Sequence, residues 1–291
     1  MSVSRTLPWQ PEQGAGLTKI KVNGVTLHVR DSGGDGTPVL MLHGWPDTGD
    51  VWRHQVDALS AAGYRVVTPD LRGFGESDKP AEVDAYGRAQ MVGDVLGLID
   101  ALDLGRVHLV GHDWGSAIAW MVALNAPQKL RSLTAMSTGH PVAFRRAGIA
   151  QKEKSWYILL FQFTGIAEEW IRQNDFENLR TVTRHPEIDE VIGRFTDPAA
   201  LTGSLNLYRA MTPPESNIAP VPTLPPIDLP TLGMWSTHDI ALVEAGMTGS
   251  AAHVRGPWRY ERVEGAGHWL QLDAPDRVNA ALLDFLRGLT G

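Results

Sequence analysis

One segment of the sequence has the residue types and spacing expected of a nucleophilic catalyst. The apolar run Val107–Val110 predicts a buried strand, and Gly111-His-Asp-Trp-Gly115 connects it directly to a predicted helix. Glycines on both sides of one polar residue, between a strand and a helix, are typical of a nucleophile elbow, a strained turn that exposes the central side chain. Asp113 takes the central place that Ser usually has. A carboxylate attacks an electrophilic sp³ carbon and forms an alkyl ester, so Asp113 predicts a substrate with such a carbon.

This nucleophile requires a base and an orienting acid later in the chain, in the order nucleophile, acid, histidine. His268 follows a predicted strand in the Gly-rich segment Gly265–Trp269 and is the candidate base. Asp239 follows the predicted strand Thr231–Trp235 and is the candidate acid. The other common position for the acid, after the strand that ends near Met136, has no carboxylate. The alternative role for Asp239 is that of a capping or loop carboxylate.

Two backbone amides are candidates for an oxyanion hole. The segment His43-Gly-Trp-Pro46 follows the apolar run Pro38–Leu42, and the N–H of Trp45 would be one donor. The N–H of Trp114, the residue after the nucleophile, would be the other. Because removal of one such donor typically costs about 10²–10³ in rate, these amides are expected to matter for the hydrolysis of the ester.

A sheet has to position these residues. Apolar runs alternate with helical patterns up to Met136, which predicts a doubly wound, mostly parallel sheet. Asn23-Gly24 between two alternating segments predicts a hairpin before that sheet begins. Strands are predicted over Lys19–Val22, Val25–Val29, Pro38–Leu42, Tyr64–Thr68, Val107–Val110, Leu130–Met136, Thr231–Trp235 and Trp258–Val263. Helices are predicted over Val51–Ala61, Gln90–Leu102, Ser116–Asn125 and Val278–Leu289.

The alternation of strands and helices stops near His140. From there to Met211 the pattern is helical and rich in aromatic residues, and residues 213–230 hold seven of the nineteen prolines. A Pro-rich stretch is stiff and extended, so it predicts a connector that returns to the sheet. We therefore expect the first part of an α/β core over residues 1–140, a helical cap over 141–212, a connector over 213–230 and the second part of the core over 231–291.

The composition excludes several classes of protein. The 291 residues include no Cys, which excludes a cysteine nucleophile and any disulfide. The formal net charge of −7 argues against nucleic acid as a partner. Residues 1–17 lack the features of a signal peptide, and no apolar run approaches the length of a membrane span, so a cytoplasmic location is expected. No metal or cofactor is expected, and the sequence makes no prediction of oligomeric state.

These motifs resemble those of the α/β-hydrolase-fold epoxide hydrolases, and the resemblance covers nearly the whole chain. It implies an α/β-hydrolase fold with an inserted helical cap, and a small hydrophobic epoxide and water as substrates. The segments that carry the resemblance are His43–Pro46, Pro69–Pro80, Gly111–Gly115 and Gly267–Trp269.

The resemblance also implies two catalytic tyrosines in the cap, which in this family hydrogen-bond to the epoxide oxygen. Tyr157 stands five residues before Gln162, and Gly165-Ile-Ala-Glu168 follows. Tyr208 stands in Asn206-Leu-Tyr-Arg209, the second family pattern. The alternative for both tyrosines is packing in the core of the cap. Two departures from the family pattern flank them and bear on the shape of the pocket, Phe163-Thr164 and Leu207.

The implied reaction has two steps. Tyr157 and Tyr208 polarise the epoxide oxygen while Asp113 opens the ring at carbon. His268, oriented by Asp239, then activates the water that hydrolyses the ester, and a 1,2-diol leaves. A poor leaving group such as an alkoxide needs acid assistance, which contributes about 10²–10⁴ in rate.

The main alternative is a haloalkane dehalogenase, which uses the same Asp–His–acid machinery on carbon–halogen bonds. The indole N–H of Trp114 would suit a halide, but a halide needs no acid, so the tyrosine pair favours an epoxide. A fluoroacetate-type dehalogenase usually has Arg beside the nucleophile, where this chain has Trp114. A small-molecule receptor that has lost turnover is a further alternative, disfavoured by the intact set of candidate residues.

Overall fold

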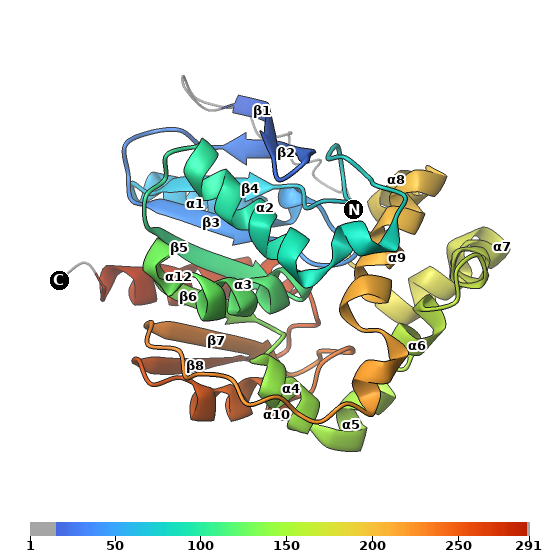
Figure 1. The fold of residues 1–291 in the computed structure, drawn as a ribbon. Coiled ribbons are helices and arrows are strands. Elements are labelled where there is room, and N and C mark those ends of the chain that lie inside the picture. The colour runs from blue at the N-terminus through green and yellow to red at the C-terminus, as the bar shows by residue number, and fades with distance from the viewer. Residues whose placement is uncertain (1–15, 290–291) are drawn as a thin grey trace, which may run out of the picture.

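An eight-stranded sheet forms the centre of the molecule (Figure 1). The computed structural model describes residues 16–289. The strand order is β1-β2-β4-β3-β5-β6-β7-β8; β1 and β2, and β2 and β4, pair antiparallel, and every other pair is parallel. The predicted doubly wound, mostly parallel sheet is therefore confirmed. The strands are β1 (Gly16–Val22), β2 (Val25–Asp31), β3 (Pro38–Leu42), β4 (Arg65–Pro69), β5 (Val107–His112), β6 (Leu130–Met136), β7 (Thr231–Ser236) and β8 (Trp258–Val263).

The first two strands form the predicted hairpin. Asn23 and Gly24 form its two-residue turn with φ angles of 46° and 81°. Both angles are positive, as a type I′ turn requires, and Asn-Gly tolerates this conformation best. The turn places Val22 opposite Val25 at the start of the ladder.

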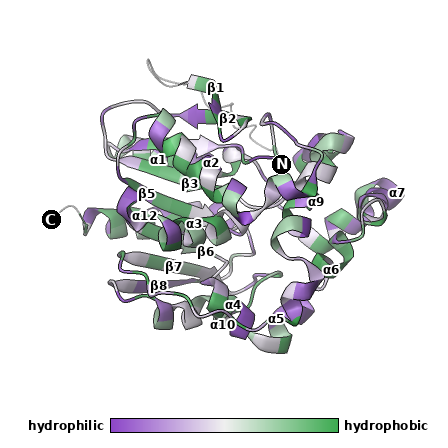
Figure 2. Ribbon diagram, viewed as in Figure 1, coloured by the Kyte–Doolittle hydropathy of each residue, from purple (hydrophilic) through white to green (hydrophobic). Residues whose placement is uncertain are grey.

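Helices cover both faces of the sheet. Along β3, Leu40 and Leu42 pack into the core that includes helices α2 and α3, whereas Val39 and Met41 pack into the core beneath α1 and α12. This alternation is the period of two of a strand, and burial of both sets explains why β3 is a continuous apolar run. Figure 2 accordingly shows the central strands mostly in the colour of hydrophobic residues. These helices are α1 (Arg53–Ala61), α2 (Arg88–Ala101), α3 (Trp114–Asn125) and α12 (Pro275–Arg287).

All four predicted helices differ from the observed ones at their first residues, and α2 and α3 each begin two residues before the predicted start. The segment predicted as one helix from Val51 starts as a 3-10 turn, η1 (Gly49–Trp52), and only continues as α1. The terminal helix begins at Pro275, three residues before the predicted start. Proline suits the first turn of a helix because its missing N–H has no intrahelical partner there, and the apolar pattern alone does not reveal this residue.

Six helices connect β6 to the segment before β7, where the sequence predicts a helical cap. Figure 1 shows α5 to α9 together on the right, beyond the ends to which the parallel strands point. The Pro-rich segment that follows has one 3-10 turn, η4 (Pro214–Asn217), and an isolated bridge between Ile227 and Val254. The six helices are α4 (Pro141–Arg146), α5 (Gly148–Lys154), α6 (Tyr157–Phe161), α7 (Ile166–Thr183), α8 (Ile188–Phe195) and α9 (Pro198–Met211).

Shorter elements complete the chain between the larger ones. None of the helices in the described part of the chain is long and apolar enough to cross a membrane. The prediction about a signal peptide falls almost wholly on residues 1–15, which lie outside the described residues. The remaining elements are η2 (Val83–Tyr86), η3 (Pro127–Lys129), α10 (Glu244–Thr248), η5 (Gly249–His253) and α11 (Leu270–Asp273).

Candidate active site

Asp113 is the single residue between the end of β5 and the start of α3. Its backbone has φ 52° and ψ −117°, a conformation that costs free energy and is typical of functional sites. A Cβ atom on Gly111 would lie 2.3 Å from the carbonyl oxygen of Gly115, and a Cβ on Gly115 would lie 2.0 Å from that of Leu42. The turn is therefore possible only with glycine at both positions, which is the physical content of the Gly-x-Asp-x-Gly pattern.

Two backbone amides point to the carboxylate of Asp113. The Trp45 N–H donates to its Oδ1 at 3.0 Å, and the Trp114 N–H also hydrogen-bonds to it. The loop that carries Trp45 approaches so closely that a Cβ on Gly44 would lie 2.5 Å from Oδ1 of Asp113. Glycine at this position thus lets the amide reach the carboxylate. The two amides predicted as oxyanion donors therefore lie at the same side chain.

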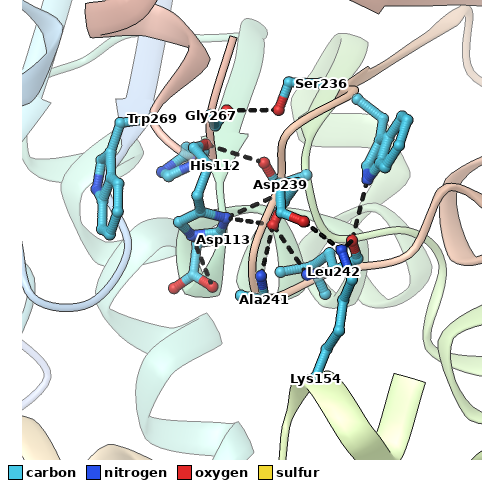
Figure 3. Close-up of polar contacts among 12 residues, drawn as sticks. His112, Asp113, Lys154, Ser236, Asp239, Ala241, Leu242, Gly267 and Trp269 are labelled. Atoms are coloured by element: carbon cyan, nitrogen blue, oxygen red, sulfur yellow. Dashed lines mark hydrogen bonds and ion pairs between the residues drawn. The ribbon is translucent and has the colours of Figure 1, made fainter. Parts of the chain in front are cut away.

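His268 forms a hydrogen-bonded pair with Asp239 beside the candidate nucleophile Asp113, and Figure 3 labels both of these carboxylates. The Nδ1 atom of His268 is 3.0 Å from Oδ2 and 3.1 Å from Oδ1 of Asp239. The amides of Ala241 and Leu242 donate to Oδ1 of Asp239 at 2.8 and 2.9 Å, which fixes the carboxylate. On the other side of the ring, Nε2 lies 3.7 Å from Oδ2 of Asp113. The fold thus brings Asp113 next to Asp239 and His268, which lie 126 and 155 positions later in the chain.

The three groups shift one another's proton affinity. Burial raises the pKa of Asp113, and the nearby His268 and the two amides only partly oppose this effect. Burial alone would lower the pKa of His268, but the carboxylates of Asp239, Asp113 and Asp47 outweigh it and raise this pKa to about 9. Burial opposes ionisation of Asp239, yet His268 keeps its pKa below the usual value. At neutral pH the site therefore holds an imidazolium between carboxylates.

Two tyrosine hydroxyls from the cap face this site. Tyr157 begins α6 and Tyr208 lies in α9; their ring centroids are 6.1 Å apart and their hydroxyls hydrogen-bond to each other. The ring of Tyr208 also packs edge-on against Trp114, with centroids 5.0 Å apart. Burial, followed by the charge of Asp113 and other nearby groups, raises the pKa of both tyrosines. Both hydroxyls therefore keep their protons and are able to donate them.

A cleft of about 470 Å³ opens beside these residues. Tyr157 and Asp239 are part of its wall, so it reaches the candidate site. Trp156, whose side chain is 48% exposed, and Ile240 give the wall an apolar part. The cleft therefore gives solvent access to Tyr157.

The sequence matches a family model described as alpha/beta hydrolase fold over residues 37–275. It is 32% identical to epoxide hydrolase A of Mycobacterium tuberculosis, with 93% of this chain and 97% of the relative aligned. It is 34% identical to epoxide hydrolase 3 of Xenopus tropicalis, with 94% of this chain and 77% of the relative aligned.

The chain belongs to the α/β-hydrolase-fold epoxide hydrolases.

Solved structures of this family have the same architecture. An epoxide hydrolase from metagenomes of hot environments superposes with a TM-score of 0.84 at 32% identity, covering 93% of this chain and 98% of that one. Epoxide hydrolase A of Mycobacterium thermoresistibile superposes with a TM-score of 0.78 at 30% identity, covering 94% and 98%. The prediction of an α/β-hydrolase-fold epoxide hydrolase is therefore confirmed.

The sequence patterns around the two tyrosines of this epoxide hydrolase have a structural reason. Arg209, one residue after Tyr208, donates to Oε2 of Glu168 at 2.9 Å and to Oδ1 of Asn206 at 2.9 Å. Gln162 donates to the backbone carbonyl of Tyr208 at 3.3 Å. These bonds join α6, α7 and α9, so the residues of both patterns hold the elements that carry the tyrosines. The spacing alone shows the pattern and not this network.

Some residues close to the triad are absent from the sequence-based predictions. His112, directly before the nucleophile, is buried, and its Nε2 hydrogen-bonds to the backbone oxygen of His268 at 2.9 Å. Lys154 of α5 donates to the backbone carbonyl of Asp239. Asp47 directly follows the His43–Pro46 segment and is buried. Its position next to a predicted oxyanion loop is the one sequence signal that could have drawn attention to it.

Proposed function

We propose that this chain hydrolyses an epoxide to a 1,2-diol through an alkyl ester on Asp113. The observation that carries the proposal is the pair of cap tyrosines, Tyr208 buried and Tyr157 partly buried, whose rings lie together and whose pKa values the charge of Asp113 helps to raise. The names of the relatives support the reaction class. A structure of a Bacillus megaterium epoxide hydrolase variant, with a TM-score of 0.80 and 28% identity, contains its product, a naphthyloxy-propane-1,2-diol.

The first step is ring opening. Asp113 attacks an epoxide carbon from behind the C–O bond, a C–O ester bond forms, and the ring C–O bond breaks with its electrons on oxygen. Tyr157 and Tyr208 hydrogen-bond to that oxygen and supply a proton as the alkoxide develops. Since positioned acids contribute about 10²–10⁴ in rate, this interaction makes a strained ether a workable substrate.

The second step is hydrolysis of the ester. Alkylation neutralises Asp113 and so removes one of the charges that keep His268 protonated. Its pKa falls, its proton restores the tyrosine that protonated the alkoxide, and the neutral ring becomes able to take a proton from water. The resulting hydroxide attacks the ester carbonyl, and the Trp45 and Trp114 amides stabilise the oxyanion. Collapse of the intermediate releases the diol and restores the carboxylate.

The domain organisation serves the same reaction. We propose that residues 1–140 and 231–291 form the core that supplies the nucleophile, acid and base, and that residues 141–212 form a cap that supplies the tyrosines. Residues 213–230 connect the cap to the core. The rings of Trp45, Phe161 and Tyr208 pack against one another where cap and core meet. These aromatic walls support a small hydrophobic epoxide as the substrate.

The indole groups at the site argue against a haloalkane as the substrate. The indole N–H of Trp114 hydrogen-bonds to Tyr208, and that of Trp45 donates to Oγ of Ser204 at 3.1 Å. A halide would have to break one of these bonds before an indole could stabilise it. The tyrosines, by contrast, already direct hydroxyls toward the nucleophile.

Tyr208→Phe provides the test that separates the two reactions. We expect about a 10²-fold lower kcat/KM on a styrene-oxide-like epoxide, because the alkoxide loses one of its two donors. The measurement is diol formation by wild type and variant, next to halide release from 1-bromobutane. Wild type is expected to release no halide. Halide release by wild type without diol formation would overturn the proposed function in favour of a dehalogenase.

The two steps are expected to differ in their dependence on pH. Ring opening requires ionised Asp113, so its rate constant decreases as pH falls through a pKa that burial raises above 3.8. Hydrolysis requires neutral His268, whose pKa in the ester lies below its resting value of about 9. Its rate constant therefore increases with pH until that lower pKa is passed. Single-turnover rate constants measured across pH check both; a hydrolysis rate that decreases as pH rises toward 9 would contradict the role of His268.

A further inference from the structure

Asp47 lies behind the candidate base and is one of the most completely buried acids of the described residues. It follows the oxyanion loop, and its amide donates to the carbonyl of Gly44 at 3.0 Å. Its side chain is 4% exposed. The reaction derived above gives this carboxylate no chemical step. A buried carboxylate is expensive unless its oxygens have partners, so its partners indicate what it does.

Each oxygen of Asp47 accepts one hydrogen bond from a different part of the molecule. Oδ1 is 2.9 Å from Nε2 of His185, in the turn between α7 and α8 of the cap. Oδ2 accepts from the indole Nε1 of Trp269 at 2.8 Å. Burial opposes ionisation of Asp47, but His185, together with Arg194 and His112, lowers its pKa to about 2, so the group is an anion.

The direction of the contact with His185 is fixed. The backbone N–H of Glu187 donates to Nδ1 of His185 at 2.9 Å, so this nitrogen acts as an acceptor. In the neutral ring the proton must then be on Nε2, which donates to Asp47. The carboxylate thus accepts hydrogen bonds from Nε2 of His185 and Nε1 of Trp269, and neither donor has another acceptor among the described residues. An asparagine amide in place of the Asp47 carboxylate would direct its N–H group toward one of these two donors, so that hydrogen bond would be lost.

Trp269 transmits the position of Asp47 to the base. It is the residue after His268, and the two rings meet edge to face with centroids 4.7 Å apart at 90°. The other side of the indole meets the ring of His185 with centroids 4.3 Å apart. The hydrogen bonds with Asp239 fix the position of Nδ1 of His268. They do not stop the imidazole ring from rotating about the line of these bonds. The indole, held by Asp47, limits this rotation together with the ring of His112, whose centroid also lies 4.7 Å from that of His268.

We propose that Asp47 is a positioning residue for the hydrolysis step, because it holds Trp269 against the ring of His268 and joins this indole to the cap through His185. The inference rests on the proposed function, since it assumes a covalent ester that His268 hydrolyses. It assigns Asp47 to the second step only. Ring opening uses Asp113 and the tyrosines, whereas the side chain of Asp47 hydrogen-bonds to His185 and Trp269 among the described residues.

The test is a single-turnover measurement that resolves the two steps, on Asp47→Asn and, separately, on Trp269→Phe. Both variants are expected to form the ester at a rate within about threefold of wild type. Hydrolysis is expected to be about 10- to 100-fold slower, since small misplacements of a catalytic group have effects of that size. Quenched samples should then contain accumulated ester on Asp113, seen by mass spectrometry. Trp269→Phe replaces the indole by a smaller aromatic ring without the N–H, so it tests the indole and its hydrogen bond even if Asp47→Asn fails to fold.

Glu187→Gln is the matched control. It weakens the ion pair between Glu187 and Arg53, another contact between cap and core, without touching Asp47 or Trp269. We expect both of its rate constants to equal those of wild type. Equal slowing of both steps in the Asp47 and Trp269 variants, unchanged hydrolysis in both, or the same ester accumulation in Glu187→Gln would each overturn the proposal. Absence of any ester in wild type would instead overturn the proposed function.

Discussion

Asp113→Ala is expected to abolish diol formation, with kcat reduced by about 10⁴-fold or more. The variant has no atom that could form the bond to carbon. Because no ester forms, the Trp45 and Trp114 amides have no oxyanion to stabilise. The measurement is diol release under saturating epoxide, with mass spectrometry of the protein after exposure to substrate. No adduct is expected on the variant.

The loss of activity in Asp113→Ala should not come from unfolding. The pKa of Asp113 is higher in the folded protein than its ordinary value, because burial disfavours the anion. At neutral pH the ionised group therefore destabilises the fold, and its removal is expected to leave the melting temperature unchanged or raise it. A strongly lowered melting temperature would show that activity was lost with the structure, and substantial residual turnover would contradict the covalent route.

His268→Gln is expected to stop the reaction half-way. Asp113 and both tyrosines remain, so the ring still opens, but no group takes a proton from the water. The ester should persist on Asp113, and the mass of the protein should increase by the mass of the substrate. We expect one equivalent of epoxide to be consumed, followed by turnover at least about 10³-fold slower than wild type.

The position of the adduct distinguishes this mechanism from direct attack of water on the epoxide. Proteolysis of the trapped His268→Gln protein should place the added mass on the peptide that contains Asp113. In the wild type, reaction in ¹⁸O water should introduce label into the Asp113 carboxylate as the ester is hydrolysed. A His268→Gln protein that is inactive and carries no adduct would contradict an ester intermediate, since ring opening does not require the neutral base.

Much of the fold follows from local patterns. The run Pro38–Leu42 is apolar throughout because both of its faces are buried, and the structure has β3 over these residues. Asn23-Gly24 specifies its turn through backbone conformation alone. The starts of helices are less predictable: Gly49–Trp52 forms a 3-10 turn where the apolar spacing predicts the first turn of an α-helix.

The sequence by itself predicted the reaction class, epoxide hydrolysis, with Asp113 as the proposed nucleophile. Gly111 and Gly115 identify the elbow because a Cβ atom at either position would lie about 2 Å from a backbone oxygen. These oxygens belong to Gly115 itself and to Leu42 on the adjacent strand. An aspartate at that position already implies attack on an sp³ carbon.

Only the tertiary structure decided how the partners of Asp113 are held. Trp269 binds Asp47 across 222 positions of sequence, and His185 binds it across 138. Such contacts depend on the packing of loops from separate strands and on the seating of helices α7 and α8, which no local pattern encodes. The protonated state of His268 has the same origin, since its pKa is set by carboxylates that folding brings together from three different loops.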